Sequence, residues 1–528
     1  MTQGERVGES TEEVPGGRTA RIVRNTLVRG GAQGVSVVAS FVMLPFLVRA
    51  FTLGDYGVFM LASAVTSYAA LLDLGVGSTL VRMVAERLAR GERDQVGAVV
   101  ASAGVFYAVV GLVAALAMVA IGILGRSIFA VQPAQAQLLT RLLLIGAAVQ
   151  LLYWPASAAA HALSGFERYD LISAIAMAQT IGGVLAVAAV LLLGLGPVDL
   201  ALINAGITVV TSLANIVLFA KVARGRIGTL RPRSSLVNRV VRDGLPLFAL
   251  QMSALLGRQT TDRIVLGVFL GPEAVGVYEI AAKLSLLVSQ AGDLLTGAIL
   301  PIAANMSARE HAESLRALLM RGARYTVVAI APVIVVLACI ARPFINDWFG
   351  PGMAGAALVA QVLLLGQVLV PLYLVGDPIL IGMNRFARWV VPAFSVAVLN
   401  VALSVVFVKI FGLVGVAIGT AIAGFVEFPL YVRLAVRETG VDWRAWLWQA
   451  FFPGYPLLVV PACIALLGAA TFLGQSLLTL FAVSVVALGA YWALAWWLVL
   501  PRWERAELVA AAGTMVRRPD ATRPIRSR

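Results

Sequence analysis

An apolar stretch of the chain carries ionisable residues at a spacing that could bind an anion. Residues 255–271, LLGRQTTDRIVLGVFLG, contain Arg258, Asp262 and Arg263. Arg258 and Asp262 are four residues apart, so they share one face of a helix. The planar guanidinium group of arginine can bind two oxygens of a phosphate at once, and a neighbouring aspartate can accept a charge-assisted hydrogen bond from it. This spacing predicts an anion site at Arg258 that Asp262 holds in place.

A second pair of charges follows after a short turn. Glu279 and Lys283 are again four residues apart in an apolar segment. If the two segments fold back on each other, Asp262 comes level with Lys283, and Arg263 comes level with Glu279. Internal pairing could therefore neutralise much of the charge, although three bases face only two acids. We expect Arg263 to pair with Glu279 and the surplus positive charge to lie on Arg258. Asp262 can bond to Arg258 or pair with Lys283, and Lys283 is a further candidate to bind the anion.

Other ionisable residues allow more than one interpretation of their role. Arg29 could give the anion a second contact, or its side chain could extend to the membrane interface. Asp377 and Glu427 lie in later apolar segments and could carry protons or bind a cation, or they could cap helix ends. His161 and His311 have no partner within reach along the sequence. No metal site and no cofactor are predicted.

The elements that position these charges are predicted to be membrane helices. Hydrophobic residues make up 60% of the 528 residues and charged residues 13%, whereas about a quarter of a soluble domain is charged. Such a chain could not cover a surface that faces water. Windows of about 20 apolar residues predict fourteen spans, hence an all-α integral membrane protein. These spans lie near 26–50, 57–80, 97–122, 139–162, 170–194, 200–220, 244–269, 275–299, 325–347, 355–381, 389–411, 413–435, 450–473 and 476–500.

The charges in the loops predict the orientation of these spans. With the N-terminus inside, most of the 41 Lys and Arg residues fall in inner loops and tails, as the positive-inside rule requires. Both termini are therefore predicted to be cytoplasmic. This asymmetry also accounts for most of the net charge of +14, and nucleic-acid binding is not indicated because no aromatic platform accompanies the basic residues. The basic residues predicted on the outer side are Arg49, Arg126, Arg141, Arg342 and Lys409.

Two similarities at one spacing indicate an internal repeat. The pair Leu53–Gly54 precedes the pair Leu270–Gly271 by 217 positions, and Gly165 precedes Gly382 by the same number. Six spans separate the copies, so both copies share one orientation, and transporters of this type bind substrate between their halves. The predicted organisation is a tail at 1–24, a six-helix lobe at 25–222, a basic cytoplasmic linker at 223–242, a second six-helix lobe at 243–436, two extra helices at 437–500 and a basic tail at 501–528.

The repeat separates residues that serve the scaffold from residues that serve a site. Asp73 and Asp293 occupy matching places in the two copies and are expected to be structural. The other charges occur in one copy only, and a charge in hydrocarbon costs a few kcal/mol. With two extra residues allowed in the second turn, the first copy has Phe41, Pro45, Met60 and Ala64 where the second has Arg258, Asp262, Glu279 and Lys283.

Four stretches resemble the polysaccharide flippases of the multidrug/oligosaccharidyl-lipid/polysaccharide exporter superfamily. The resemblance implies flipping of a lipid-linked oligosaccharide, usually on undecaprenyl diphosphate, across a bacterial inner membrane. It implies membrane lipids as partners, with other polysaccharide-assembly proteins as further candidates, and no enzymatic activity. The stretches are LGDYGVFML (53–61), ALLDLGVGSTLVR (70–82), DRIVLGVFLGPEAVGVYEIAAKL (262–284) and AILPIAA (298–304).

Two other functions are compatible with this pattern. One is a cation-coupled multidrug exporter of the same superfamily, although such an exporter would favour an acidic, aromatic pocket. The other is a membrane-embedded polysaccharide polymerase or ligase, although the outer loops are short and the longest carries Arg126 and no acid. An ATP-driven pump is not indicated, because the chain has no GxxxxGK loop for nucleotide phosphates.

Overall fold

The computed structural model describes residues 41–506, apart from 226, 257–259, 297–298, 300–302, 304–305, 308–311, 351–352, 384 and 472–475. Every regular element in this described part is a helix, which confirms the all-α prediction. Arg29, Arg258 and His311 lie outside the described residues.

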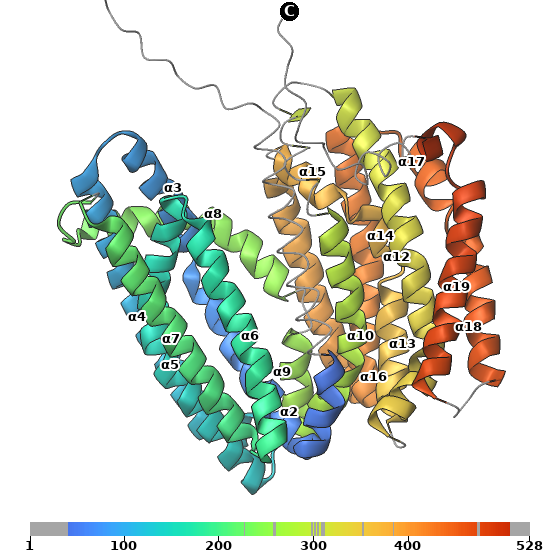
Figure 1. Ribbon diagram of the computed structural model, residues 1–528, viewed down its shortest axis with the longest axis horizontal. Coiled ribbons are helices and arrows are strands. Elements are labelled where there is room, and N and C mark those ends of the chain that lie inside the picture. The colour runs from blue at the N-terminus through green and yellow to red at the C-terminus, as the bar shows by residue number, and fades with distance from the viewer. Residues whose placement is uncertain are drawn as a thin grey trace, which may run out of the picture.

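The helices form two bundles that lie side by side (Figure 1). The first bundle contains α3 (Val76–Ala89), α4 (Arg93–Ile128), α5 (Pro133–Gly165), α6 (Tyr169–Leu193) and α7 (Pro197–Ala223). The second bundle contains α10 (Pro272–Thr296), α12 (Ala312–Phe349), α13 (Ala354–Gly366), α14 (Val370–Tyr373), α15 (Gly376–Gly382), η2 (Phe386–Trp389), α16 (Val390–Thr439), α17 (Trp443–Trp446), η3 (Leu447–Phe451), η4 (Pro456–Leu458), α18 (Val459–Thr471) and α19 (Leu477–Leu498).

Three helices connect the bundles. The helix α2 (Leu53–Tyr68) packs on α5 of the first bundle and on α10 of the second, and α9 (Thr260–Phe269) packs on both α2 and α16. The helix α8 (Ser234–Leu256) begins inside the segment predicted as a linker and contacts α3 and α4 as well as α16. Figure 1 shows the bundles meeting at the lower end, where α2, α9 and α10 converge, and standing apart at the upper end.

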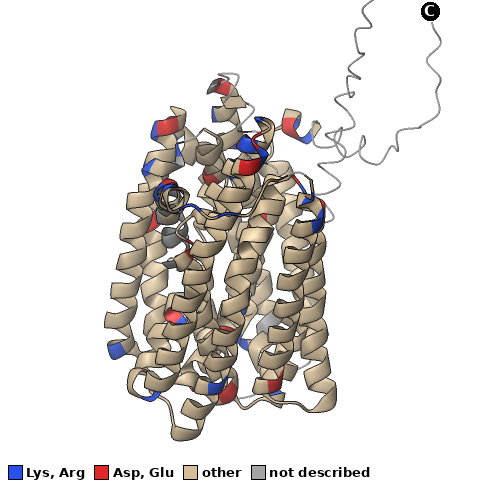
Figure 2. Ribbon diagram, turned by 90° about the vertical axis from the view of Figure 1, so that its left-hand side faces the viewer, with Lys and Arg blue, Asp and Glu red and all other residues tan. Residues whose placement is uncertain are grey.

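The two ends of the bundles differ in charge. Most of the ribbon positions of Lys and Arg lie at the upper end, and a few lie at the opposite end (Figure 2). The connection between α3 and α4 and the linker before α8 meet at the upper end, because Gly228 N–H donates to the carbonyl of Arg93 at 3.0 Å. We call the upper end the basic end, and the end where α2, α9 and α10 converge the seam end.

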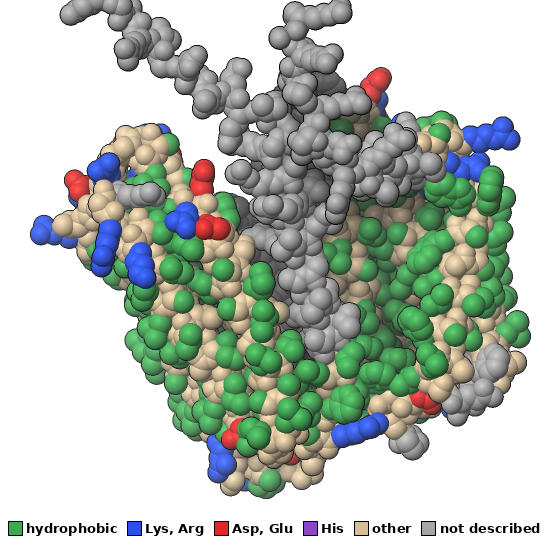
Figure 3. Space-filling model, in the orientation of Figure 1, with side chains coloured by type: hydrophobic (Ala, Val, Ile, Leu, Met, Phe, Trp, Pro, Cys, Tyr) green, Lys and Arg blue, Asp and Glu red, His purple; other side chains and the backbone are tan. Residues whose placement is uncertain are grey.

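Length and surface identify a multi-pass membrane protein. Ten helices of the described part are long and apolar enough to span a membrane, and apolar side chains cover the sides of both bundles (Figure 3). The helix α16 accounts for two predicted spans. Its two arms fold back at Gly412, whose φ is 59°, so that Gly419 lies against the backbone of Ser404. The count of fourteen spans remains a prediction.

A break follows the 3-10 turn η1 (Ala69–Asp73), between α2 and α3. Leu74 and Gly75 both have left-handed backbone conformations, with φ of 50° and 73°. The Asp73 carboxylate accepts a hydrogen bond from the Tyr107 hydroxyl at 2.6 Å and lies 3.5 Å from the amide nitrogen of Gly77. Asp73 therefore holds the first turn of α3 and joins it to α4, as a structural residue would.

Candidate functional site

The ionisable residues of the second copy lie in the hairpin that α9 and α10 form. The Nε atom of Arg263 donates to Oε1 of Glu279. The Arg263 side chain is 20% exposed and that of Glu279 is 1% exposed, so a buried carboxylate depends on this arginine for its counter-charge. This is the arrangement predicted from the folding of the hairpin. Removing one partner of such a pair leaves an uncompensated charge, which is strongly destabilising.

Asp262 has different partners from those predicted. It is 1% exposed, and its Oδ2 atom accepts hydrogen bonds from the hydroxyl of Tyr278 and, at 3.0 Å, from that of Thr420. The hydrogen bonds of the described residues include none between Lys283 and Asp262, and the pairing of these two residues across the hairpin stays a prediction. The second arm of α16 brings a hydroxyl to the carboxylate, while Tyr278 supplies another from α10.

The second oxygen of this carboxyl lies among neutral polar groups. Oδ1 of Asp262 is buried and has no hydrogen-bond partner among the described residues. Ser404 and Asn400, on the first arm of α16, are 0% and 5% exposed, and the Ser404 hydroxyl lies near the carboxyl group. One carboxylate among neutral oxygens suits a proton or a small hard cation. The described residues contain no group of three or more His, Cys, Asp and Glu side chains that could hold a metal ion.

The polar residues around Asp262 were not predicted from the sequence. Asn400 and Ser404 are four residues apart in an apolar segment, which is the spacing of one helix face. That spacing was the available signal, because a buried polar pair in a membrane helix needs a partner. Thr420 gave no such signal, since threonine commonly bonds to its own helix in a membrane span.

A second acidic group lies nearer the basic end of the second bundle. Asp377 is in the first turn of α15, whereas Glu427 lies within α16, away from its end at Thr439. The two carboxyl groups are close enough for their charges to interact. Oδ1 of Asp377 and the hydroxyl of Tyr431 are buried, with no hydrogen-bond partner among the residues described. Helix capping by Glu427 is therefore excluded, and a proton or cation site remains open.

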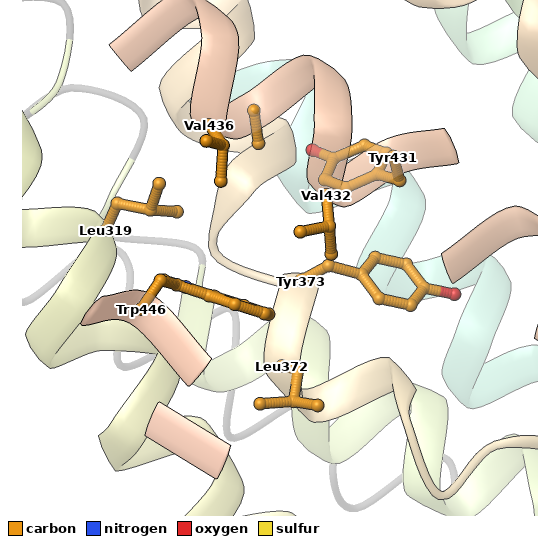
Figure 4. Close-up of a pocket in the computed structure, with 8 residues that line it drawn as sticks. Leu319, Leu372, Tyr373, Tyr431, Val432, Val436 and Trp446 are labelled. Carbon is orange, nitrogen blue, oxygen red and sulfur yellow. The ribbon is translucent and has the colours of Figure 1, made fainter. Parts of the chain in front are cut away.

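An apolar hollow borders this acidic group. Tyr431 lies over Tyr373 with 5.1 Å between the ring centroids, and both rings line the hollow together with Leu319 and Trp446 (Figure 4). The hollow is formed by α12, α14, α16 and α17. Its walls are apolar and aromatic and carry no charge.

His161 lies in a buried aromatic group of the first bundle. Its ring stacks on Tyr107 at 6.1 Å, and Tyr107 also stacks on Trp154 at 5.7 Å. The sequence showed no partner for this histidine because α4 and α5 bring these residues together from distant positions. Since Tyr107 donates to Asp73, the group links α4, α5 and the break before α3, which explains its burial by packing alone.

The fold is that of known transporters. The chain is similar to the structure described as lipid II flippase MurJ in an inward closed conformation, with a TM-score of 0.69 at 13% identity over 89% of this chain and 99% of that one. It is also similar to MATE family multidrug resistance transporters of the MOP superfamily. For the inward-facing form the TM-score is 0.65 at 16% identity, covering 77% and 94% of the two chains. For the outward-facing form it is 0.56 at 17% identity, covering 79% and 95%.

The family follows from the sequence itself. No curated protein matches the chain. The family model described as polysaccharide biosynthesis protein matches residues 22–307, which is more than half of the chain and includes α2 through α10. The chain belongs to this polysaccharide biosynthesis protein family, and it has the fold of the MOP superfamily transporters.

Proposed function

We propose that the protein flips a lipid-linked oligosaccharide across the membrane by alternating access. The observation that carries this proposal is the buried group of ionisable residues in α9 and α10, placed where these helices join the two bundles. Membership of a polysaccharide biosynthesis family supports a glycan substrate, and the transporter fold supports movement of one bundle against the other. The protein then acts as a transporter and not as an enzyme.

The diphosphate of the carrier lipid is the anionic group that the protein would bind. Arg263 is neutralised by Glu279, so the cations left for an anionic headgroup are Lys283, Arg258 and Arg29. Arg258 is the favoured contact because its fork can bind two phosphate oxygens. Asp262 follows Arg258 by four positions in the sequence and could hold it in place between substrates. Binding between the bundles would couple the headgroup to both of them.

The acidic residues would couple the transport cycle to an ion gradient. Asp262 lies where α9 meets both arms of α16, because Thr420 is on one arm and Ser404 on the other. A proton or small cation at its Oδ1 atom would change how α9 packs on α16, and α9 leads directly to the seam end. Asp377 and Glu427 form a second candidate coupling site. A membrane potential alone would act on the same charges.

We place the protein in the inner membrane of a bacterium, with the basic end and both termini in the cytoplasm. The positive-inside rule supports this orientation. In this orientation the seam end, where α2, α9 and α10 bring the two bundles together (Figure 1), faces the outside.

A transport assay with defined substrates tests the proposal. Purified protein would be placed in liposomes with a fluorescent oligosaccharide on undecaprenyl diphosphate, and the sugar reaching the opposite leaflet would be measured with a membrane-impermeant quencher. We expect transfer well above that of empty liposomes, with no change in the length of the glycan. Transfer at the rate of empty liposomes would contradict the proposal, and lengthening or transfer of the glycan would indicate a polymerase or ligase.

A cation-coupled multidrug exporter is the second candidate. The observation in its favour is the acidic pair Asp377 and Glu427 beside the aromatic rings of Tyr373 and Tyr431, since acids with aromatic faces suit organic cations. The same liposomes would be loaded with a cationic dye. Extrusion of the dye without transfer of the lipid-linked sugar would favour the exporter.

A further inference from the structure

A close contact joins the two copies of the repeat at the seam end. Gly57 of α2 lies directly against the first residue of α10, so that a methyl group at position 57 would overlap the carbonyl oxygen of Pro272. Pro272 begins α10 and has no backbone N–H to lose at that position. The absence of a side chain at Gly57 is therefore what allows the two backbones to approach each other here.

The same contact occurs a second time with the copies exchanged. Gly276 of α10 lies against the first residue of α2, and a methyl group at position 276 would be 2.7 Å from the carbonyl oxygen of Leu53. Leu53 precedes Pro272, and Gly57 precedes Gly276, by the same 219 positions. The offset is that of the repeat with its two extra residues. Each helix therefore begins against the glycine of the other, as expected for two copies related by one axis.

Hydrogen bonds between the bundles flank this double contact. The side-chain amide of Gln135 donates to Oε1 of Glu273 at 2.6 Å, and the N–H of Ala130 donates to the carbonyl of Gly267 at 3.0 Å. At the other side, Nη2 of Arg49 donates to the carbonyl of Trp348 at 3.2 Å. The bonds of Gln135 and Arg49 are exposed, so water can replace both partners at small cost when the bundles separate.

We propose that this seam, formed by Leu53, Gly57, Pro272 and Gly276, is the outer gate of the transport cycle, and that its two glycines are equivalent halves of it. This inference rests on the proposed alternating access, and it identifies the residues at which the two bundles close on the outer side of the membrane. Backbone packed on backbone excludes water without long side chains that would have to be repacked at each cycle. Because the two contacts are images of one another, they must form and separate together.

The test compares alanine substitutions at the two glycines by distance measurement. Cys339 and Cys463 would be replaced by serine, and spin labels would be placed at Arg126 and Lys409, one in each bundle. Without substrate, we expect the unmodified seam to give mainly the short distance. G57A and G276A should each raise the ratio of long to short distances by about tenfold or more, because a well-packed contact does not accept an added methyl. Both shifts should have the same direction, and the shift of G57A should be the larger, because its methyl group would lie 1.8 Å from the carbonyl oxygen of Pro272 whereas that of G276A would lie 2.7 Å from the carbonyl oxygen of Leu53.

Matched controls separate the seam from a general effect of alanine in a helix. G104A in α4 and G183A in α6 make the same substitution where a methyl group would meet nothing within 4 Å. Both should leave the ratio of distances unchanged. A shift in the controls as large as in G57A, a shift at only one of the two seam glycines, or no shift at either would overturn the proposal.

A second measurement does not depend on the folding of the glycine variants. Q135C and E273C would be joined by a short thiol-reactive linker in the protein that otherwise lacks cysteine. We expect the joined protein to lose transport and to regain it after reductive cleavage of the linker, and transport at the unjoined rate would overturn the gate. The distance measurement requires no substrate, so it can fail or succeed independently of the proposed flipping.

Discussion

The two copies of the repeat share their packing and differ in their chemistry. At the seam, Gly57 and Gly276 make equivalent contacts, so α2 and α10 have kept the same backbone geometry. The second copy, however, carries Glu279 where the first has Met60. Since an apolar residue serves the same place in the first copy, the fold does not require the charge. The difference indicates that the scaffold was duplicated and that the ionic chemistry belongs to one copy.

The free-energy cost of burying these charges also indicates that they serve a function and not the fold. A buried ion pair is often no more stabilising than well-packed apolar residues of similar volume. The chain nevertheless buries Glu279 at 1% exposure beside Arg263, and it leaves Oδ1 of Asp262 without a hydrogen-bond partner among the described residues. In the first copy, Asp73 has its partners in Tyr107 and in the first turn of α3. Both carboxyl groups accept hydrogen bonds, but only Asp262 keeps a buried oxygen without a partner among the described residues.

The largest effect is expected at Arg258, where the first copy has Phe41. R258A should abolish transfer of the lipid-linked sugar with normal membrane insertion. Loss of a charge-assisted hydrogen bond alone accounts for about 10–100-fold. R258K should retain part of the activity, because the charge survives and the fork does not. Transfer at the wild-type rate by R258A, at wild-type protein levels, would show that the charges only build a scaffold.

The second largest effect is expected on the stability of the protein, at the ion pair of Arg263 and Glu279. R263A should lower the free energy of unfolding by about 3–5 kcal/mol, because it strands Glu279 without a counter-charge. Replacing both residues by apolar ones, in R263L with E279M, imports the chemistry of the first copy and should restore stability. Thermal unfolding in detergent measures both variants. A double variant no more stable than R263A would refute the claim that the pair is dispensable for folding.

A smaller effect is expected at Tyr278, whose counterpart in the first copy is Phe59. Y278F removes the hydroxyl that donates to Asp262 and should destabilise the protein by about 1.5–3 kcal/mol, the range for hydrogen bonds to charged groups. The reverse change, F59Y, adds a hydroxyl where no such carboxylate occurs in the repeat and should not stabilise. Thermal unfolding of both variants measures whether Y278F lowers the stability of the protein and whether F59Y leaves it without a gain.

The smallest effect is expected away from the buried charges, at the basic end. Glu86 and Arg90 form an exposed pair on α3 with 2.6 Å between the charged atoms. E86A should change stability by only about 0.3–0.5 kcal/mol, as for other exposed pairs one helical turn apart. A loss as large as that of R263A would mean that burial does not separate the two kinds of pair.

The sequence was sufficient for features that depend on neighbours along the chain. Hydropathy predicted the all-α membrane fold, and the short turn of the hairpin placed Arg263 level with Glu279. One partner of Asp262 could not be predicted in the same way. Thr420 is 158 positions away, and only the packing of α9 on α16 brings it near. Tyr278, in contrast, lies 16 positions from Asp262 across the same hairpin, the same separation as between Arg263 and Glu279, so this hydroxyl was open to prediction and was missed.

Ion-gradient dependence tests the central claim most directly. Transfer of the lipid-linked sugar would be measured in liposomes with imposed proton, sodium or potassium gradients, for the wild type, D262N and D73N. We predict that one gradient accelerates the wild type and D73N, and that D262N transfers sugar at a rate no gradient changes, a difference of about 5–150-fold for a typical coupling energy. A response of D262N equal to that of the wild type would contradict the account, because energy would then enter elsewhere.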